Sequence, residues 1–189
     1  MFACRWVANG KTVCWVTQLV VHRDYRERGL ATGLLNELRQ ESDDVYGIMS
    51  SHPAAIIAAA KAFAGKRDWF QNVIVSWMLN ILGCMTRVRF DCMKENMVSI
   101  IQASPVKYIK EAELEGSLYN PSDASGQVSS AHTRFYVDHR LPLEALKRVK
   151  DIEGWPLGEL LEGHEFAVLF EARSRPGGKL NSASRNRPF

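Results

Sequence analysis

Residues 20–35, VVHRDYRERGLATGLL, contain the feature on which the interpretation of the whole sequence depends. A β-branched run passes into a loop with three arginines and two acids, and the loop passes into apolar residues at helical spacing. The apolar positions are Leu30, Leu34, Leu35 and Leu38, which predict a helix over 28–40 packed on a sheet. The charged residues therefore lie between a predicted strand and a predicted helix.

A helix that begins near Gly29 offers unpaired backbone N–H groups and the positive end of its dipole to an anion. Gly29 and Ala31 leave room for a phosphate, while Arg26 and Arg28 add positive charge. The alternative is that Gly29 only relieves a tight turn and the arginines are solvated. No GxxxxGK[ST] or GxGxxG pattern is present, which excludes the usual ATPase and dinucleotide sites.

The elements around this loop predict the order ββαβα. Asn9-Gly10 separates two β-rich arms within 2–21, the strongest short hairpin signal, and the second arm is apolar on both faces like a central strand. Residues 45–51 form the next predicted strand. A second, alanine-rich helix is expected after His52, with Pro53 in its first turn.

Further along, residues 95–103 and 142–151 are predicted helices, and residues 133–138 and 165–173 are predicted strands. Residues 106–116 are compatible with strand or helix, and residues 119–127 form a loop. The expected fold is α/β (α+β), with a mixed, mainly antiparallel sheet flanked by helices. One domain over 1–173 precedes a basic, disordered tail over 174–189, and 65–91 is an atypical hydrophobic insertion.

Composition narrows the functional classes. A net charge of +3 over 189 residues argues against nucleic-acid binding, and the most apolar stretch, residues 72–85, is too short for a membrane span. Attachment of this stretch and the basic tail to a membrane surface is the least favoured of the functional hypotheses. Met1–Gly10 resembles no signal peptide, so a cytoplasmic or nuclear protein is expected. The four cysteines form no CxxC pair and no metal site is predicted.

Residues 17–38, TQLVVHRDYRERGLATGLLNEL, resemble the acetyl-CoA motif of the GNAT superfamily of N-acetyltransferases, in which a strand precedes a basic [QR]-x-x-G-x-[GA] loop and a helix. The resemblance implies acetyl-CoA as acyl donor and an unidentified amine as acceptor, and a homodimer is compatible with it. The strand end would hold the pantetheine arm by its main chain, and the loop the pyrophosphate. The implied cofactor-binding residues are Leu19, Val20, Val21, Arg26, Arg28, Gly29, Leu30, Ala31 and Thr32.

The catalytic residues are not identified by the sequence. Many GNAT enzymes use a tyrosine after the fifth strand to protonate the leaving thiolate, but Phe63 stands near that place and is interpreted as core. Tyr46 and His52 are interpreted as structural, and Cys14 as a packed thiol. His132 and His139 are seven residues apart, an odd spacing that argues against a shared metal.

Two features depart from the GNAT pattern. The chain begins almost at the cofactor motif, so the sequence suggests either an abbreviated member or an internal start at Met1. Residues 65–91 have no clear period, and either a family-specific insertion, a dimer-contact helix or a retained intron would explain them. A non-catalytic acyl-CoA-binding or interaction protein is therefore the alternative function.

Overall fold

The computed structural model describes residues 1–64, 88–151 and 155–172, in which six strands form one sheet of order β1-β2-β3-β6-β5-β4. β2 and β3 are parallel, and the other neighbouring pairs are antiparallel. The strands are β1 (Phe2–Ala8), β2 (Lys11–Gln18), β3 (Val45–Ser50), β4 (Glu113–Glu115), β5 (Ser130–His132) and β6 (His164–Glu171). The mixed, mainly antiparallel sheet is confirmed.

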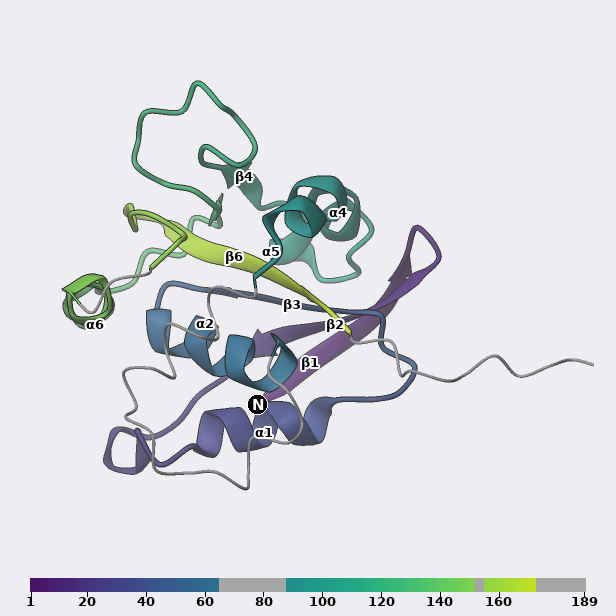
Figure 1. Ribbon diagram of the computed structural model, residues 1–189, viewed down its shortest axis with the longest axis horizontal. Helices are drawn as coiled ribbons and strands as arrows, with labels where there is room; N and C mark the ends of the chain where they lie inside the picture. The colour runs from purple at the N-terminus through teal and green to yellow at the C-terminus, as the bar shows by residue number, and fades with distance from the viewer. Residues whose placement is uncertain (65–87, 152–154, 173–189) are drawn as a thin grey trace, which may run out of the picture.

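Helices cover both faces of this sheet, as Figure 1 shows: α1 and α2 lie on one face, and α4 and α5 on the other. The helical elements are η1 (Arg23–Tyr25), α1 (Leu30–Leu38), α2 (Pro53–Ala59), the π-helical turn η2 (Ala60–Ala64), α4 (Phe90–Gln102), α5 (Lys107–Lys110) and α6 (Arg140–Asp151). The α+β class is therefore confirmed, with the helices on opposite sides of the sheet.

The predicted hairpin joins β1 and β2. Asn9 and Gly10 both have positive φ, 50° and 74°, which is the turn conformation that matches the twist of paired strands. Residues 13–16 of β2 are buried, because β2 lies between β1 and β3 and is covered on both faces. The prediction of a central strand is correct, although β2 ends at Gln18 and not at Val21.

The first two helices follow the predicted order, but the apolar stripe of α1 is only partly buried. Leu35 is inaccessible to solvent, whereas Leu30 and Leu34 are 47% and 41% exposed. The prediction that this stripe packs on the sheet is wrong in part, because α1 packs mainly against α2 and η2. α2 begins at Pro53 as predicted, and the His52 ring accepts a hydrogen bond from the Ala54 N–H.

Two predictions in the second half are corrected. Residues 133–138 are irregular, because Arg134 has a φ of 58° and both N–H groups of residues 133 and 134 donate to Gly163 O. The strand there is β5, which ends at His132. α4 starts at Phe90, five residues before the predicted helix, and Val88 before it is buried in the core.

Residues 106–116, for which the sequence allowed strand or helix, contain both, as α5 and β4. The helix predicted over 142–151 corresponds to α6, and the final strand to β6. Residues 65–87 of the insertion predicted over 65–91, and the tail over 174–189, lie outside the described residues. Among the described helices, none has the length and apolar character to cross a membrane.

The core is centred on β2, β3 and β6. Tyr46 stacks on Phe63 at a centroid distance of 4.2 Å, and Trp15 stacks on Trp6 at 6.0 Å. The Trp6 indole N–H donates to Ile100 O and so ties β1 to α4. Trp15 also lies over Gly47, its partner in the parallel β2–β3 pair.

Replacing Gly47 by alanine is expected to lower the free energy of unfolding by about 1–3 kcal/mol, because overpacking in a close-packed core forces neighbours out of place. A Cβ at this position would lie 2.1 Å from Trp15 Cε3, and Trp15 has no exposed surface. Denaturant unfolding measures the loss. The Trp15→Leu and Gly47→Ala double variant should lose less free energy of unfolding than the two single variants together. Additive losses would mean that the new Cβ does not act through Trp15.

Candidate functional site

The parallel strands β2 and β3 separate at their carboxyl ends. Their pairing ends at Val16 and Ile48, although β2 continues to Gln18 and β3 to Ser50. On the outer sides, β1 still pairs with Gln18 and β6 with Ser50. The space between the two strand ends therefore leaves main-chain groups of Thr17 and its neighbours without the partner that a continuous ladder would give them.

The predicted pantetheine-binding residues come directly after the end of β2, at this opening. Leu19 and Val21 are partly buried and Val20 is 67% exposed, and none belongs to a strand pair in the described part of the chain. The Val21 carbonyl accepts a hydrogen bond from Arg26 Nε at 3.3 Å. This segment is extended away from the sheet, with the Leu19 and Val20 main chain beside the opening.

The loop then turns into α1 through two residues in the left-handed region. Glu27 has a φ of 62° and Gly29, the N-cap of α1, a φ of 76°. Within the described part of the chain no side chain caps this helix, so the N–H groups of Leu30, Ala31 and Thr32 have no helical or capping bonds there. In Figure 1, α1 and α2 both begin at the end of the sheet where β2 and β3 end.

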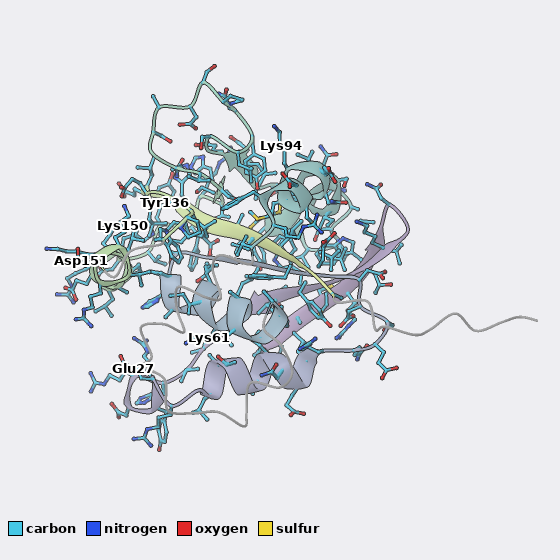
Figure 2. All side chains as sticks on the ribbon, in the orientation of Figure 1. Glu27, Lys61, Lys94, Tyr136, Lys150 and Asp151 are labelled. Atoms are coloured by element: carbon cyan, nitrogen blue, oxygen red, sulfur yellow. The ribbon has the colours of Figure 1, made fainter. Side chains whose placement is uncertain are left out.

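The charged side chains of this loop are exposed, and Figure 2 shows them extending outward around the labelled Glu27. Among the described residues, no carboxylate lies within ion-pair distance of Arg26 or Arg28. The Arg28 guanidinium lies over the Tyr25 ring at 5.4 Å. Burial, followed by the charge of Arg26, lowers the pKa of His52 at the start of α2. Uncompensated positive charge thus borders the beginnings of both helices.

On the opposite face, Tyr108 of α5 reaches over the strand opening. Its hydroxyl donates a hydrogen bond to Thr17 O at 3.2 Å. Burial of the hydroxyl end, with a smaller contribution from Glu165, raises the pKa of Tyr108 to about 12, although 41% of the residue as a whole is exposed. Tyr108 is therefore protonated at neutral pH.

Glu165 of β6 lies close enough for its charge to act on Tyr108. It is partly buried on the α5 face of the sheet, next to the residue that pairs with Ser50 at the end of β3. Burial raises its pKa above the usual range of a glutamate. A carboxylate with a raised pKa accepts a proton more readily than an ordinary one. Tyr108 and Glu165 are thus two titratable groups with raised pKa values on the same face of the sheet.

The residues that the sequence interprets as structural are confirmed as such. Phe63 is fully buried between Tyr46 and Phe170. The Tyr46 hydroxyl donates to Gln40 O, and burial raises its pKa. Cys14 has no exposed surface, and burial raises the pKa of its thiol to about 11, which suppresses the reactive thiolate.

The histidines are arranged differently from any pairing considered in the sequence. His132 does not meet His139; it stacks on His164 across the β5–β6 pair, at a ring centroid distance of 4.6 Å. Glu115 lies beside them, and the potential ligand atoms of the three residues are within 4.8 Å of one another. This group lies on the opposite face of the sheet from Glu165, because neighbouring residues of β6 alternate between the faces.

Sequence reasoning did not find Tyr108, Glu165 or the Glu115–His132–His164 group. Tyr108 lies in a segment whose secondary structure the sequence leaves ambiguous. The available signal for Glu165 was a single charged residue at the start of an apolar strand, but an outward-facing charge there is ordinary. Of the cofactor residues implied by the resemblance, all nine lie along one continuous segment at the end of β2 and the start of α1.

Comparison with known proteins leaves the family open: no family model, curated protein or solved structure matches this chain.

Proposed function

We propose that the chain is an acetyl-CoA-dependent N-acetyltransferase that transfers an acetyl group to a primary amine by direct attack on the thioester. The observation that carries this proposal is the separation of β2 from β3 immediately before the uncapped helix α1. Free main-chain groups at the strand end suit an amide-rich pantetheine arm. Free helical N–H groups with Arg26 and Arg28 suit a pyrophosphate.

The sheet order supports the same proposal at the level of the fold. A parallel β2–β3 pair inside an otherwise antiparallel sheet, with helices on both faces, is compatible with a GNAT-like domain. The acceptor amine would approach from the α5 face, where Tyr108 and Glu165 lie. The amine remains unidentified, and a small metabolite, a peptide N-terminus and a lysine are all compatible with this arrangement.

The proposed reaction needs no reagent besides acetyl-CoA, the amine and protons exchanged with solvent. Glu165 accepts a proton from the attacking neutral amine, whose nitrogen forms a bond to the acetyl carbon, and later releases that proton to solvent. Main-chain N–H groups at the β2 end stabilise the negative charge on the carbonyl oxygen. The C–S bond then breaks, and Tyr108 donates its hydroxyl proton to the departing thiolate of CoA. The tyrosine recovers a proton from solvent.

A catalytically inactive acyl-CoA-binding or interaction protein is the second candidate. The observation that favours it is Phe63, a fully buried residue without a hydroxyl near the position where many GNAT enzymes have a catalytic tyrosine. This candidate predicts acetyl-CoA binding with no release of free CoA across a panel of amines. Release of CoA with any amine, at a rate above spontaneous hydrolysis, decides for the enzyme.

Acetyl-CoA is expected to stabilise the folded chain against heat. A ligand that binds only the folded state adds about 2.7 kcal/mol at 100 times its Kd. Thermal unfolding with increasing acetyl-CoA measures the shift. S-acetyl-pantetheine, which lacks the pyrophosphate, is the control ligand and should stabilise far less at equal concentration. A folded chain that shows no shift at saturating acetyl-CoA would remove both candidate functions.

A further inference from the structure

We propose that Glu115, His132 and His164 bind a zinc ion. They come from the three neighbouring strands β4, β5 and β6 and share one face of the sheet. His132 and His164 are directly opposite each other, and Glu115 reaches the His164 ring from β4. The site is separate from the proposed acetyl-CoA site and does not depend on it.

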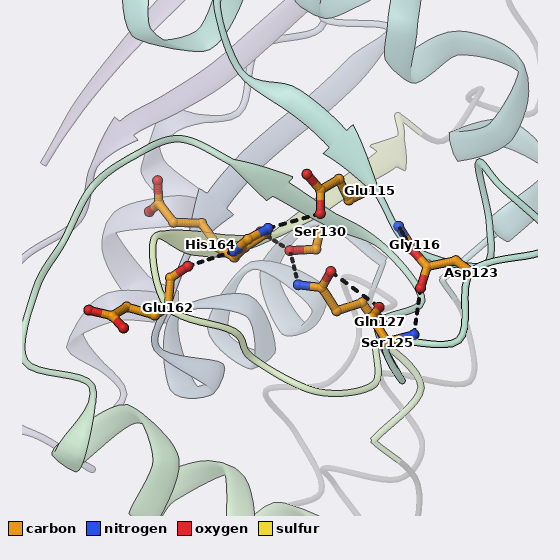
Figure 3. Close-up of polar contacts among 9 residues, drawn as sticks. Glu115, Gly116, Asp123, Ser125, Gln127, Ser130, Glu162 and His164 are labelled. Carbon is orange, nitrogen blue, oxygen red and sulfur yellow. Dashed lines mark hydrogen bonds and ion pairs between the residues drawn. The ribbon is translucent and has the colours of Figure 1, made fainter.

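The contacts of His164 place its Nε2 atom against a carboxylate oxygen. The ring Nδ1 lies 2.7 Å from Glu162 O, which can only accept, so Nδ1 carries a proton. The ring Nε2 lies 3.0 Å from Glu115 Oε2, a second acceptor, as Figure 3 shows. A zinc ion between these two atoms would bind Nε2 and the carboxylate oxygen while Nδ1 keeps its hydrogen bond. A backbone carbonyl on the other ring nitrogen is the arrangement that fixes metal-binding histidines in their ligating tautomer.

The position of His132 favours a bound metal ion over a simple ion pair between His164 and Glu115. An ion pair between His164 and Glu115 needs no third group, yet the potential ligand atom of His132 lies within 4.8 Å of both partners. No hydrogen bond to the His132 ring is found within the described ranges. Gly163 keeps space beside it, since a Cβ there would lie 3.3 Å from His132 Nε2. A partly exposed imidazole without a polar partner in the described ranges thus lies beside the group, stacked on the His164 ring.

Distances and neighbouring charges fit an ion of this size. Bonds of about 2.0–2.1 Å to zinc place tetrahedral ligands roughly 3.3 Å apart. The pair of His164 and Glu115 is close to this spacing, and His132 must turn its ring out of the stack on His164 to reach the ion. Glu113, the residue opposite His132, is occupied by an ion pair with Arg134 at 2.6 Å. Glu115 is therefore the carboxylate left for the metal.

Two imidazoles and one carboxylate favour zinc or a similar late transition ion over magnesium or calcium, which prefer oxygen ligands. Three protein ligands leave a coordination position for water or a ligand group. His164 is 8% exposed and the Glu115 side chain 39% exposed, so that position faces solvent on the Glu115 side. The ion would also join the short strands β4 and β5 to β6.

The test uses the full chain, stripped with EDTA and kept reduced, and titrated with Zn²⁺ against a chromophoric chelator. We expect one ion per chain, and a loss of affinity of about 100-fold or more in both His132→Gln and Glu115→Gln, because losing a ligand should cost at least as much as the roughly 10–100-fold loss of an outer-shell partner. His22→Gln, which removes an exposed histidine outside the group, is the control and should keep the affinity. Co²⁺ should give the visible absorption of a four- or five-coordinate ion.

Circular dichroism of each variant confirms that it is folded, which separates loss of the site from loss of the fold. His132 and Glu115 are only partly buried, so both variants are expected to fold. A folded wild-type chain that binds no Zn²⁺ overturns the proposal. Binding that survives either substitution also overturns it and assigns the ion elsewhere, for example to the thiols of the chain. Neither outcome bears on acetyl-CoA binding.

Discussion

Replacing Gly29 by valine is expected to weaken acetyl-CoA binding about 100-fold or more. Gly29 has a φ of 76°, a conformation that costs a residue with a Cβ roughly 1–2 kcal/mol. The loop either keeps this strain or moves and misaligns the free N–H groups of the first helical turn. Each hydrogen bond to a charged group contributes about 1.5–3 kcal/mol, so the loss of one or two accounts for the expected factor.

Isothermal titration calorimetry with acetyl-CoA measures this effect, and circular dichroism confirms that the variant is folded. A Cβ at Gly29 would meet no described atom within 4 Å, so the substitution should not disrupt the core. Gly33→Ala is the matched control, because Gly33 is in the same helix, has no atom within 4 Å of its Cβ position and lacks positive φ. It should keep the affinity and stabilise α1 by up to about 1 kcal/mol. Wild-type affinity in the valine variant would remove Gly29 from the site.

Replacing Glu165 by glutamine is expected to lower kcat by about 10²–10⁴-fold, the usual contribution of a general base. Acetyl-CoA affinity should stay unchanged, because the cofactor residues lie at the end of β2 and the start of α1. A thiol-release assay with an accepted amine measures turnover. Glu162→Gln changes the same charge on an exposed side chain three residues away, and turnover should be retained. Equal losses in both variants would argue against a specific role for Glu165.

The same substitution is expected to stabilise the fold at neutral pH. Burial raises the pKa of Glu165 in the folded state, so the unfolded chain ionises first as the pH increases. The stability of the wild-type chain therefore decreases as the pH rises from the ordinary glutamate range through the raised pKa. Glutamine removes this loss, and the difference in melting temperature between the two chains should grow with pH. A difference independent of pH would contradict a raised pKa.

The catalytic rate is expected to change with pH in the direction opposite to the stability, rising as the pH increases. Glu165 must be ionised to accept a proton, so kcat is expected to fall as the pH decreases through its raised pKa. Tyr108, whose pKa is raised to about 12, stays protonated throughout this range and does not limit the reaction. The ionised form of Glu165 would thus lower the stability of the fold and yet be the form that the proposed reaction requires. This combination is expected of a catalytic residue.

The sequence by itself determined the features that depend on neighbouring residues. Asn9-Gly10 specified the hairpin because both residues adopt positive φ, and Gly29 and Pro53 marked the beginnings of α1 and α2. These choices are made by the local backbone, so they can be read without the fold. The continuous segment from Leu19 to Thr32 belongs to this class, because one strand end and one helix start bring its residues together.

Only the tertiary structure decided which distant residues meet. Tyr108 contacts Thr17 across 91 positions, and Glu115 contacts His164 across 49. These contacts depend on the strand order and register of β2 to β6, which long-range packing sets and no local pattern encodes. His132 illustrates the difference: its spacing to His139 was visible in the sequence, but its actual partner is His164, placed opposite by the β5–β6 register.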